Sequence, residues 1–387
     1  MVIPQGRFDL AVVGAGILGL ATAWAAVRQG LRVVVVDRDA QANGASVRNF
    51  GFVTVSGQCR ASMWARARRT REVWSELAAA ANIPIVHRGL MVTARRPESV
   101  AVLEEFMGTE MAEGCRLLTA SEARRRCPQL ATPDLLAVLE STLELRVESV
   151  QAIPRLATWL NEARGVHFMR GTAVTGIEMP VITTSRGTLE ATRVAVCPGD
   201  DFNTLYADYL AGYSLTRCKL QMLRLADPGF KLPAALMSDL SLARYLGYAA
   251  LGAAAALKAR LEREQPRHLE HGVHLIVVQS ADGSLVVGDS HEYAATPDPF
   301  SHEHVDALIR EEFRASLGFE PPPTLERWTG TYASASDRQV LIGAPEDRVR
   351  IAIVTCGAGA STAFAIGEEI VASLLDERTR VDESTLA

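Results

Sequence analysis

The chain has 387 residues, 48% hydrophobic and 22% charged, an ordinary soluble composition that is long enough for two domains. A formal net charge of −5 at pH 7 excludes a general attraction to nucleic acid or another polyanion. The six cysteines are scattered without a CxxC pair, which indicates reduced thiols in a cytoplasmic protein rather than a disulfide framework.

An uncharged run over residues 10–27 has the length of a signal peptide or a membrane span. Asp9 stands directly before it, and the strand-like sequence VVVVD follows without a break. These flanks do not fit a cleaved leader, and the glycines inside the run have a spacing that serves another purpose. We therefore expect neither secretion nor a membrane span.

The run begins with an apolar strand, residues 8–13, that leads into the Gly-x-Gly-x-x-Gly pattern. Gly14 would make the tight turn, Gly16 would let the backbone approach a pyrophosphate, and Gly19 would let the following helix pack closely. That helix, expected over residues 17–29, points its free N–H groups at the phosphates.

A second strand is expected over residues 31–36, and Asp37 ends it about 20 residues after the glycines, where an acid binds ribose hydroxyls. Strand, glycine turn, helix, strand and acid together predict a dinucleotide site. The alternative is a glycine-rich tight turn that binds no ligand, and in that case the position of Asp37 would be a coincidence. The acid also disfavours NADP, because it would repel the 2′-phosphate.

The segment after Asp37 bears on the choice between NAD and FAD. An NAD-dependent dehydrogenase would continue with a helix and a strand, whereas this chain has a loop containing Gly44, Ala45 and Ser46. Small residues and a hydroxyl there would lie beside the pyrophosphate again. The next helical stretch comes only at residues 63–81.

The middle of the chain predicts short helices and strands. Thr119 and Glu122 resemble a capping box, Pro154 is placed near a helix start, and Ser301 is expected to cap a helix. We expect helices over 98–106, 121–126, 154–163 and 251–263, and strands over 84–93, 166–177, 193–197, 218–225 and 274–288.

Three histidines, His268, His271 and His274, recur at three-residue spacing. They could hold a metal ion, or they could be surface histidines at a helix end. Gly272 interrupts a helix and His274 opens a strand, so we expect the side chains to diverge and predict no metal site.

The C-terminal region repeats the opening pattern. A strand is expected over 349–355, Gly357 and Gly359 form a turn, and a helix follows over 361–375. A second glycine turn that leads into a helix N-terminus can face a flavin ring, which is anionic when reduced. FAD is therefore favoured over NAD.

Taken together, these segments resemble the D-amino-acid oxidase superfamily of FAD-dependent oxidoreductases, which includes glycine oxidase and sarcosine oxidase. The similarity extends over the whole chain. It is carried by VVGAGILGLATAWAAVRQG, VVVVDRD, GASVRNFG, RGTAVTGIE, ATRVAVCPG, DGSLVVGDSHEY, RWTGTYASASD and the C-terminal GAGAS helix. SVRNFG, KLQMLR, GVHLIVVQSADGSLVVGDSHEY and RWTGTYA are similar to a branch found with phosphonate catabolism genes and linked to oxidation of aminoalkylphosphonates.

The resemblance implies an α/β fold, with a Rossmann-like FAD-binding domain of the GR2 type and an inserted α+β substrate domain on an antiparallel sheet. It places the FAD domain at 1–86, 147–215 and 329–387, and the substrate domain at 87–146 and 216–328. The expected FAD-binding residues are Gly14, Ala15, Gly16, Ile17, Leu18, Asp37, Arg38, Gly44, Ala45, Ser46, Arg48, Asn49, Val174, Gly199, Gly357, Gly359, Ser361 and Thr362.

The resemblance also identifies the substrate end. Glycine and D-amino-acid oxidases place a carboxylate-binding arginine two residues after the glycine of a WxG motif, and this chain has Tyr332 there. The substrate anion would then need another cation, Arg48 or Arg244. Arg48 could instead contact the flavin or its pyrophosphate, and Arg244 could be an ordinary surface arginine.

Three further residues are expected near the reaction. Asn49 would lie beside the isoalloxazine, and Tyr245 would line the pocket or pack in the core. His291 would contact substrate, promote reaction with oxygen as a cation, or stand in an exposed turn. We expect catalytic roles for Asn49, His291 and Tyr332.

The departures from the family pattern limit the prediction. Sarcosine oxidase relatives attach flavin through a cysteine near Tyr332, and Cys356 does not match that position, so we expect noncovalent FAD. Those relatives also use a lysine on the substrate sheet to activate oxygen, and SLVVGDSHEY has none.

We predict an FAD-dependent oxidation of a small amine, an aminoalkylphosphonate, with O2 or another electron acceptor. A glycine-, sarcosine- or D-amino-acid-type oxidase, a flavin dehydrogenase, an NAD-dependent dehydrogenase and a non-catalytic flavoprotein remain alternatives.

Overall fold

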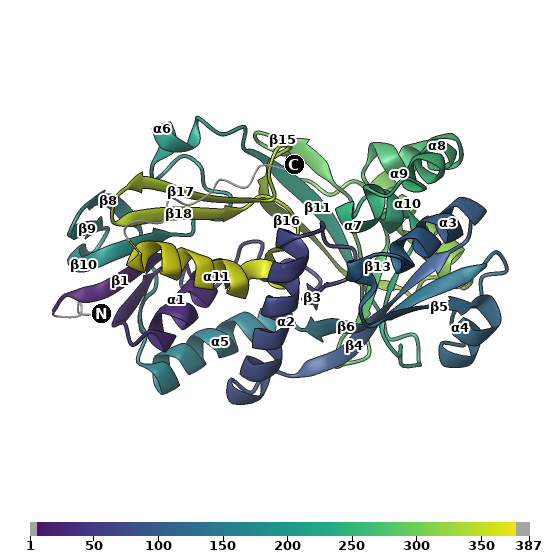
Figure 1. Ribbon diagram of the computed structural model, residues 1–387, viewed down its shortest axis with the longest axis horizontal. Coiled ribbons are helices and arrows are strands. Elements are labelled where there is room, and N and C mark those ends of the chain that lie inside the picture. Colours follow the sequence, from purple (N-terminus) through teal and green to yellow (C-terminus); the bar gives the residue numbers. More distant parts are fainter. Residues whose placement is uncertain (1–5, 377–387) are drawn as a thin grey trace.

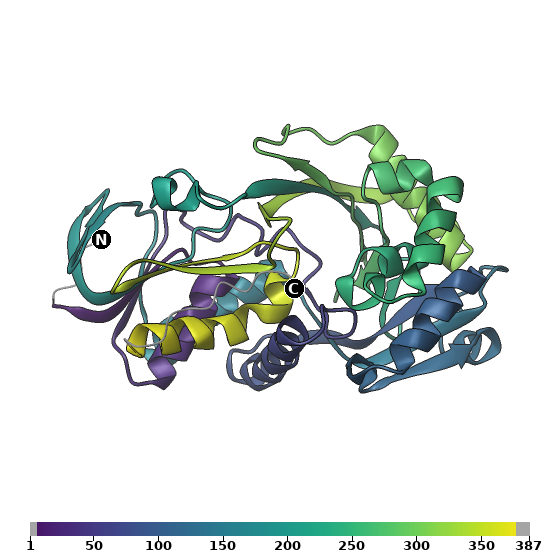
Figure 2. The same ribbon diagram turned by 45° about the horizontal axis from the view of Figure 1, so that its top comes forward.

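A computed structural model describes residues 6–376, which form two sheets with helices packed against them (Figures 1 and 2). The first sheet is mixed, and its central order is β17-β18-β10-β1-β2-β7. Its strands are β1 (Phe8–Val13), β2 (Val33–Val36), β7 (His167–Met169), β8 (Val174–Glu178), β9 (Val181–Thr184), β10 (Gly187–Val196), β17 (Val340–Glu346) and β18 (Val349–Val354).

The centre of this sheet is parallel: β1 pairs in parallel with β2 and β10, and β10 pairs in parallel with β18. All four residues of β2 are buried valines, as expected for a parallel strand that is covered on both faces. The carboxyl ends of β1, β2 and β18 therefore meet at one edge, where the two glycine turns follow.

Four helices accompany the first sheet: α1 (Ile17–Arg28), α2 (Ser62–Ala80), α5 (Ser149–Arg164) and α11 (Gly359–Leu375). Phe364 of α11 packs edge-on against Trp24 and Trp74, with ring centroids 5.4 and 5.1 Å away. A Cβ on Gly367 would lie 2.7 Å from the backbone of Ala21, so the glycine lets α11 approach α1 closely. The two ends of the chain thus share one core, and α1 and α11 lie side by side in Figure 1.

The second sheet has the order β15-β11-β14-β13-β12-β4-β6-β3, with β16 paired to β11 and β5 to β6. Its strands are β3 (Phe52–Val53), β4 (Ile85–Ala94), β5 (Cys115–Thr119), β6 (Ala137–Val147), β11 (Thr216–Leu225), β12 (Ala235–Met237), β13 (Ile276–Gln279), β14 (Leu285–Gly288), β15 (Glu292–Ala294) and β16 (Thr324–Ser334). The long antiparallel ladder between β11 and β16 runs from Thr216 opposite Ser334 to Leu225 opposite Thr324. It carries β16 back toward the first sheet.

The second sheet is accompanied by short helices and is drawn on the right of Figure 1. These are α3 (Pro97–Met107), η1 (Glu110–Ala112), α4 (Ala120–Arg126), η2 (Asp239–Ala243), α7 (Leu246–Ala249), α8 (Ala254–Glu264), α9 (Pro266–Glu270) and α10 (Glu303–Leu317), with α6 (Ala207–Leu210) in the connection from β10. In chain order the strands alternate between the sheets, so the chain crosses from one sheet to the other four times.

This alternation confirms the predicted α/β fold with a second unit built on a largely antiparallel sheet. The domain limits given above stay a prediction, and residues 1–5 and 377–387 lie outside the described residues. Two of those limits differ from the sheet pairing, because β3 and the whole of β16 belong to the second sheet. The Thr119–Glu122 capping box is present.

Two predicted helix starts are wrong. Helix α5 begins at Ser149, so Pro154 lies inside it, because the buried apolar stripe starts before the proline, with Ala152 and Ile153. Helix α10 begins at Glu303 with His302 as its N-cap, not Ser301. The His302 N–H donates to Gln221 Oε1 at 2.7 Å, which a local sequence pattern cannot show.

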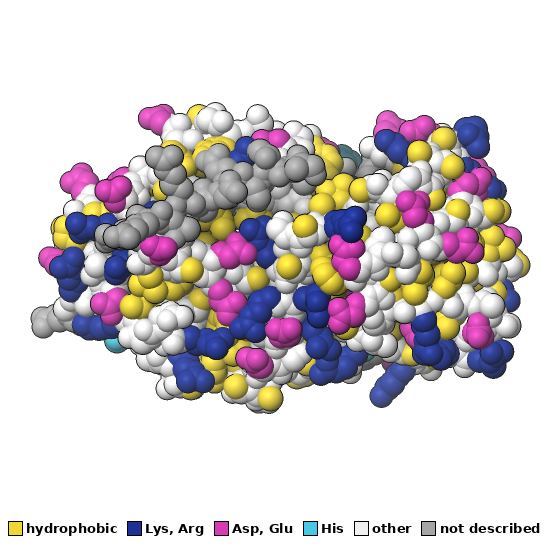
Figure 3. All heavy atoms as spheres, viewed as in Figure 1, with side chains coloured by type: hydrophobic (Ala, Val, Ile, Leu, Met, Phe, Trp, Pro, Cys, Tyr) yellow, Lys and Arg dark blue, Asp and Glu magenta, His cyan; other side chains and the backbone are white. Residues whose placement is uncertain are grey.

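The described helices include none that is both long enough and apolar enough to cross a membrane. Figure 3 shows arginine and acidic side chains mixed on one face. Arg66 and Arg69 of α2 form ion pairs with Glu369 and Glu368 of α11. This face therefore carries both signs of charge side by side.

Candidate cofactor and substrate site

One cavity of about 640 Å³ reaches both glycine-rich turns. Gly14 and Gly16 line it from the first turn, and Gly357 and Gly359 line it from the second. A Cβ on Gly359 would lie 3.9 Å from Ile17 Cγ2, so the two helix N-termini are neighbours. The cavity also extends to the ends of β14 and β16, which belong to the second sheet.

The first glycine turn is shaped by contacts that only glycine permits. Gly14 has φ of +103°, and a Cβ there would lie 2.4 Å from the carbonyl oxygen of Cys197. A Cβ on Gly19 would lie 1.9 Å from the Gly14 carbonyl oxygen. The turn therefore holds α1 against β1 and leaves its backbone open to the cavity, as the spacing predicts.

Asp37 and Ser46 complete this end of the cavity. Asp37 Oδ2 accepts the Ala15 N–H at 2.6 Å, and its Oδ1 accepts the Asp39 N–H at 2.8 Å. Ser46 Oγ accepts the Ile17 N–H at 2.9 Å, so the loop after β2 caps the N-terminus of α1. Both side chains line the cavity, beside the turn where a pyrophosphate and its ribose would lie.

The loop that contains Arg48 and Asn49 is held by its own side chains. Asn49 Nδ2 donates to the Ala45 carbonyl at 2.6 Å, and its Oδ1 accepts the Gly51 N–H at 2.6 Å and the Ser149 hydroxyl at 2.8 Å. The Arg48 guanidinium donates to Asn43 Oδ1 at 3.0 Å. Both residues line the cavity, and these bonds fix the loop that borders it.

The second glycine turn is anchored from the other side. Ser361 Oγ accepts the Thr54 N–H at 2.9 Å, and Trp74 Nε1 donates to the Ala360 carbonyl at 3.0 Å. Ser361 lines the cavity, whereas Thr362 is fully buried and donates to the Ala358 carbonyl at 2.9 Å. The anchoring bonds present the N-terminus of α11 to the cavity.

Nearly all the predicted FAD-binding residues line this cavity. The two that do not are Ala15, whose N–H is taken by Asp37, and Thr362. Among them, Val174 and Gly199 line the cavity although they come from β8 and from the turn after β10.

Arg244, Tyr293 and Tyr332 form a polar group at the substrate end. Arg244 Nη2 donates to Tyr293 Oη at 3.0 Å. Burial alone would lower the pKa of Arg244, but Tyr293, Tyr332 and Asp289 raise it above its ordinary value. Among residues 6–376, no carboxylate oxygen lies within 4.0 Å of this guanidinium. It is a permanent cation in the cavity wall with donors to spare.

Two tyrosines at this end stay protonated. Burial raises the pKa of Tyr332 well above its ordinary value, and burial raises the pKa of Tyr245 as well. A Cβ on Gly357 would lie 3.6 Å from the Tyr332 hydroxyl, so this phenol lies next to the second glycine turn. Both groups can donate a hydrogen bond to a ligand without carrying charge.

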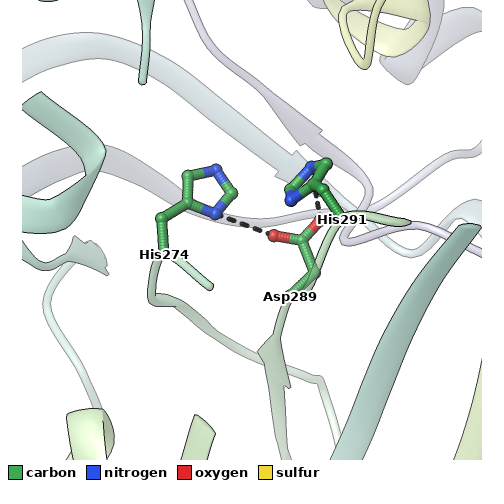
Figure 4. A group of neighbouring side chains, drawn as sticks. All are labelled: His274, Asp289 and His291. Atoms are coloured by element: carbon green, nitrogen blue, oxygen red, sulfur yellow. Dashed lines mark ion pairs between the residues drawn. The ribbon is translucent and has the colours of Figure 1, made fainter. Parts of the chain in front are cut away.

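Three buried residues, His274, Asp289 and His291, lie together in the same wall. Figure 4 shows the His274 and Asp289 side chains pointing toward one another, with His291 beside the carboxylate. His274 Nδ1 lies 2.9 Å from Asp289 Oδ1, and His291 Nε2 lies 3.8 Å from Asp289 Oδ2. His291, expected to contact substrate, to act on oxygen as a cation or to stand in an exposed turn, is buried in this wall. The expectation of a cation is wrong, because burial and Arg244 lower the pKa of its ring.

The pKa values in this group follow from burial and from Arg244. Burial and the nearby Arg244 guanidinium lower the pKa of His291 well below its ordinary value, so its ring is neutral at neutral pH. Burial alone would raise the pKa of Asp289, but His291, His274 and Arg244 lower it, and Asp289 remains a carboxylate.

The three regularly spaced histidines do diverge. His271 packs against His304, with ring centroids 4.8 Å apart, while His274 faces Asp289. The reading of all three as surface residues is wrong, because His268 and His274 are buried. The spacing gave no signal for the proximity of His274 and Asp289, which arises from the antiparallel pairing of β13 with β14.

The family model described as FAD dependent oxidoreductase, DAO, matches residues 9–373. The chain belongs to the DAO family of FAD-dependent oxidoreductases. FAD is the family's cofactor, and the cavity fits it. The first turn has glycines at positions where a Cβ would collide with neighbouring backbone, and the N-termini of two helices border the same cavity.

Solved structures show the DAO fold over nearly the full chain. Glycine oxidase from Bacillus cereus is 16% identical and superposes with a TM-score of 0.77, covering 96% of both chains. L-α-glycerophosphate oxidase from Mycoplasma pneumoniae, solved with FAD bound, is 17% identical, with a TM-score of 0.75 and coverage of 96% of this chain and 95% of that one. Iminodiacetate oxidase from Chelativorans sp. is 16% identical, with a TM-score of 0.72 and coverage of 96% and 97%.

No curated protein matches this DAO-family chain in sequence. At these identities the structures establish the fold, and the substrate has to be argued from the residues of the cavity.

Proposed function

We propose that this enzyme oxidises the C–N bond of a small amine that carries an anionic group, an aminoalkylphosphonate such as 2-aminoethylphosphonate or its N-methyl derivative. Water would hydrolyse the resulting imine to an aldehyde and an amine, and O2 would be reduced to H2O2. The observation that carries the proposal is Arg244, a cation in the cavity wall that forms no ion pair with a carboxylate of the described chain.

Arg244 is better suited than Arg48 to bind the substrate anion. The Arg48 guanidinium already donates to Asn43 Oδ1 and to the Thr329 carbonyl, whereas the bond of Arg244 goes to a neutral phenol. Tyr332 occupies the position where the amino-acid oxidases carry an arginine, and it offers one neutral donor. The anion would therefore bind at a different place from an α-carboxylate, as suits an acid group farther from the amine.

FAD would be held without a covalent bond by the glycine turns, Asp37, Ser46 and the N-termini of α1 and α11, and it would supply the two-electron acceptor. Cys356 lines the cavity, and burial raises the pKa of its thiol to about 11. A protonated thiol is a poor nucleophile, which supports noncovalent attachment.

A flavin dehydrogenase with an acceptor other than oxygen is the second candidate. Among the described residues, Lys219 of β11 is the only lysine in a strand of the second sheet. It forms ion pairs with Glu292 at 2.7 Å and Asp298 at 2.9 Å. It is thus engaged away from the cavity lining. A glycine-, sarcosine- or D-amino-acid-type oxidase would differ only in where the substrate acid binds.

The test is anaerobic reduction of the flavin. Purified FAD-loaded enzyme is mixed with 2-aminoethylphosphonate, its N-methyl derivative, glycine, sarcosine and D-alanine, and bleaching of the visible flavin band is followed. The proposal expects the phosphonates to bleach the flavin fastest. Faster bleaching by an α-amino acid would move the enzyme to the alternative class, and bleaching by none of the amines would refute amine oxidation. Readmitting air then separates an oxidase from a dehydrogenase.

A further inference from the structure

The His274–Asp289–His291 cluster brings several unshared electron pairs together in a buried place. His291 Nδ1 lies 2.9 Å from the Gly272 carbonyl, which can only accept, so the ring proton must be on Nδ1. The neutral ring then has a lone pair on Nε2, the atom that lies 3.8 Å from Asp289 Oδ2. Two acceptors therefore face each other.

The other half of the cluster is also unsatisfied. His274 Nδ1 and Asp289 Oδ1 are 2.9 Å apart, yet both atoms are buried and neither makes a hydrogen bond of normal geometry. The side chains of His274 and Asp289 are 4% and 7% exposed. A buried carboxylate with incomplete hydrogen bonding is costly, and a cation with several donors would satisfy it.

The cavity determines which kind of cation suits the cluster. The three side chains offer one ligand atom each within 4.8 Å of one another, which would also allow a divalent metal. However, Arg244 is close enough to lower the pKa of His291, and its field would oppose a doubly charged ion in the same way. A primary ammonium carries a single charge, and its N–H donors suit the carboxylate of Asp289 and the lone pair on His291 Nε2.

We propose that Asp289 and His291, with His274 positioning the carboxylate, form the site that binds the substrate's ammonium group and takes one proton from it before oxidation. This inference rests on the proposed amine oxidation. The N–H bond of the ammonium breaks, its electron pair stays on the substrate nitrogen, and the proton bonds to His291 Nε2. Asp289 stabilises the resulting imidazolium, and the neutral amine gains the lone pair that it needs to form the C=N bond.

His274 is a positioning residue in this scheme. Its ring is stacked against Tyr245, with centroids 5.5 Å apart and planes 22° apart, and this stacking holds Nδ1 toward Asp289. The charged and titratable groups that act on His291 are Arg244, Asp289 and His274. Tyr245 and Tyr332 border the same space and stay neutral.

The first test measures ammonium binding without any turnover. Ethylammonium chloride is titrated into the oxidised, FAD-loaded enzyme by calorimetry and by the flavin difference spectrum. The Asp289→Asn variant keeps the side-chain shape, and it should bind ethylammonium at least about 10-fold more weakly because it loses one charge-assisted bond. Asp282→Asn is the matched control, because Asp282 is exposed and pairs with Arg224 at the far end of the same hairpin. Equal binding by wild type and Asp289→Asn would overturn the proposal, whether or not any amine is oxidised.

The second test uses pH. Flavin reduction by the fastest amine of the panel is measured anaerobically from about pH 7 to about pH 10.5 in wild type, Asp289→Asn and His291→Gln. Both variants should be slower by at least about 10-fold near pH 7 and within about 3-fold near pH 10.5, where the free amine needs no base.

A deficit that is the same at every pH would mean that the cluster is only structural and would overturn the proposal. So would a stoichiometric metal ion in the purified enzyme that is lost in His274→Gln. If Asp289→Asn does not retain FAD, the pH dependence of flavin reduction in His291→Gln decides instead. The control is that His291→Gln binds FAD as tightly as wild type. Failure of every amine to reduce the flavin would refute the proposed function and leave the ethylammonium result to stand by itself.

Discussion

Replacing Arg244 with methionine should weaken binding of the anionic amine and leave the fold intact. Methionine keeps the aliphatic length and removes the charge. The described chain gives this guanidinium one hydrogen bond, to Tyr293 Oη, so the loss in the free energy of unfolding should be no more than about 0.5–1.5 kcal/mol.

The loss in substrate binding should be larger. A hydrogen bond between charged groups contributes about 1.5–3 kcal/mol, and each 1.36 kcal/mol is a factor of ten, so kcat/KM should fall by about 10-fold to 150-fold. Arg244 is only half-buried, which places the expectation toward the lower end of this range.

The assay compares kcat/KM for 2-aminoethylphosphonate with that for ethylamine, which has no acid group, in wild type, Arg244→Met and Arg48→Met. The Arg244→Met loss should appear for the phosphonate and be small for ethylamine. A larger phosphonate-specific loss in Arg48→Met would assign the anion to Arg48. Equal losses for both amines in Arg244→Met would refute the reasoning, because the arginine would then not be recognising the acid group.

Three further outcomes are expected. Gly19→Ala places a Cβ 1.9 Å from the Gly14 carbonyl, so it should destabilise the protein by about 1–3 kcal/mol and weaken FAD retention, as thermal unfolding and FAD release would show. Gly252→Ala, away from the cavity lining and with its nearest neighbour, the Glu105 carboxylate, at an ordinary 3.6 Å, should do neither. Precipitation with acid should leave the yellow colour in solution, because the thiol of Cys356, with a pKa of about 11, is protonated at neutral pH; colour in the pellet would contradict noncovalent FAD. Burial lowers the pKa of His87 to about 4 from 6.5. The unfolded state then binds more protons than the native state between these values, so stability should fall as pH decreases from about 7 to 4. Wild type should lose about 2–3 kcal/mol more than His87→Gln over that range in denaturant unfolding, and parallel curves would show that His87 titrates normally.

The sequence predicts the nucleotide end of the molecule well because its determinants are local. Gly14, Gly16, Gly19 and Asp37 act through a strand, a turn and a helix that follow one another, and each lies where the spacing places it. The C-terminal glycine turn obeys the same rule, and its convergence on the first turn follows from the parallel pairing of β1, β10 and β18.

The substrate end is less predictable because its contacts join distant segments. Arg244 follows η2, Tyr293 lies in β15, and Tyr332 lies in β16, and only the folded sheet brings them together. His274 and Asp289 meet because the Ile276–Gly288 pair aligns β13 with β14, a register that the alternation of residues does not specify. The start of α10 differs from the prediction for a similar reason, since the Gln221 side chain that accepts the His302 N–H comes from a distant strand. The start of α5 has a local cause, because its buried stripe begins with Ala152 and Ile153, before the proline.

The four passages of the chain between the two sheets have a mechanical consequence. Rotation of one sheet away from the other would have to bend all four passages together, so hinge opening would involve four segments of the chain and not one. Leu246 and Tyr293 line the cavity and are exposed, so they form part of its rim. A protease cut between the sheets would fail to release an independent nucleotide-binding half, because α11 and β18 return to it from the far end of the polypeptide.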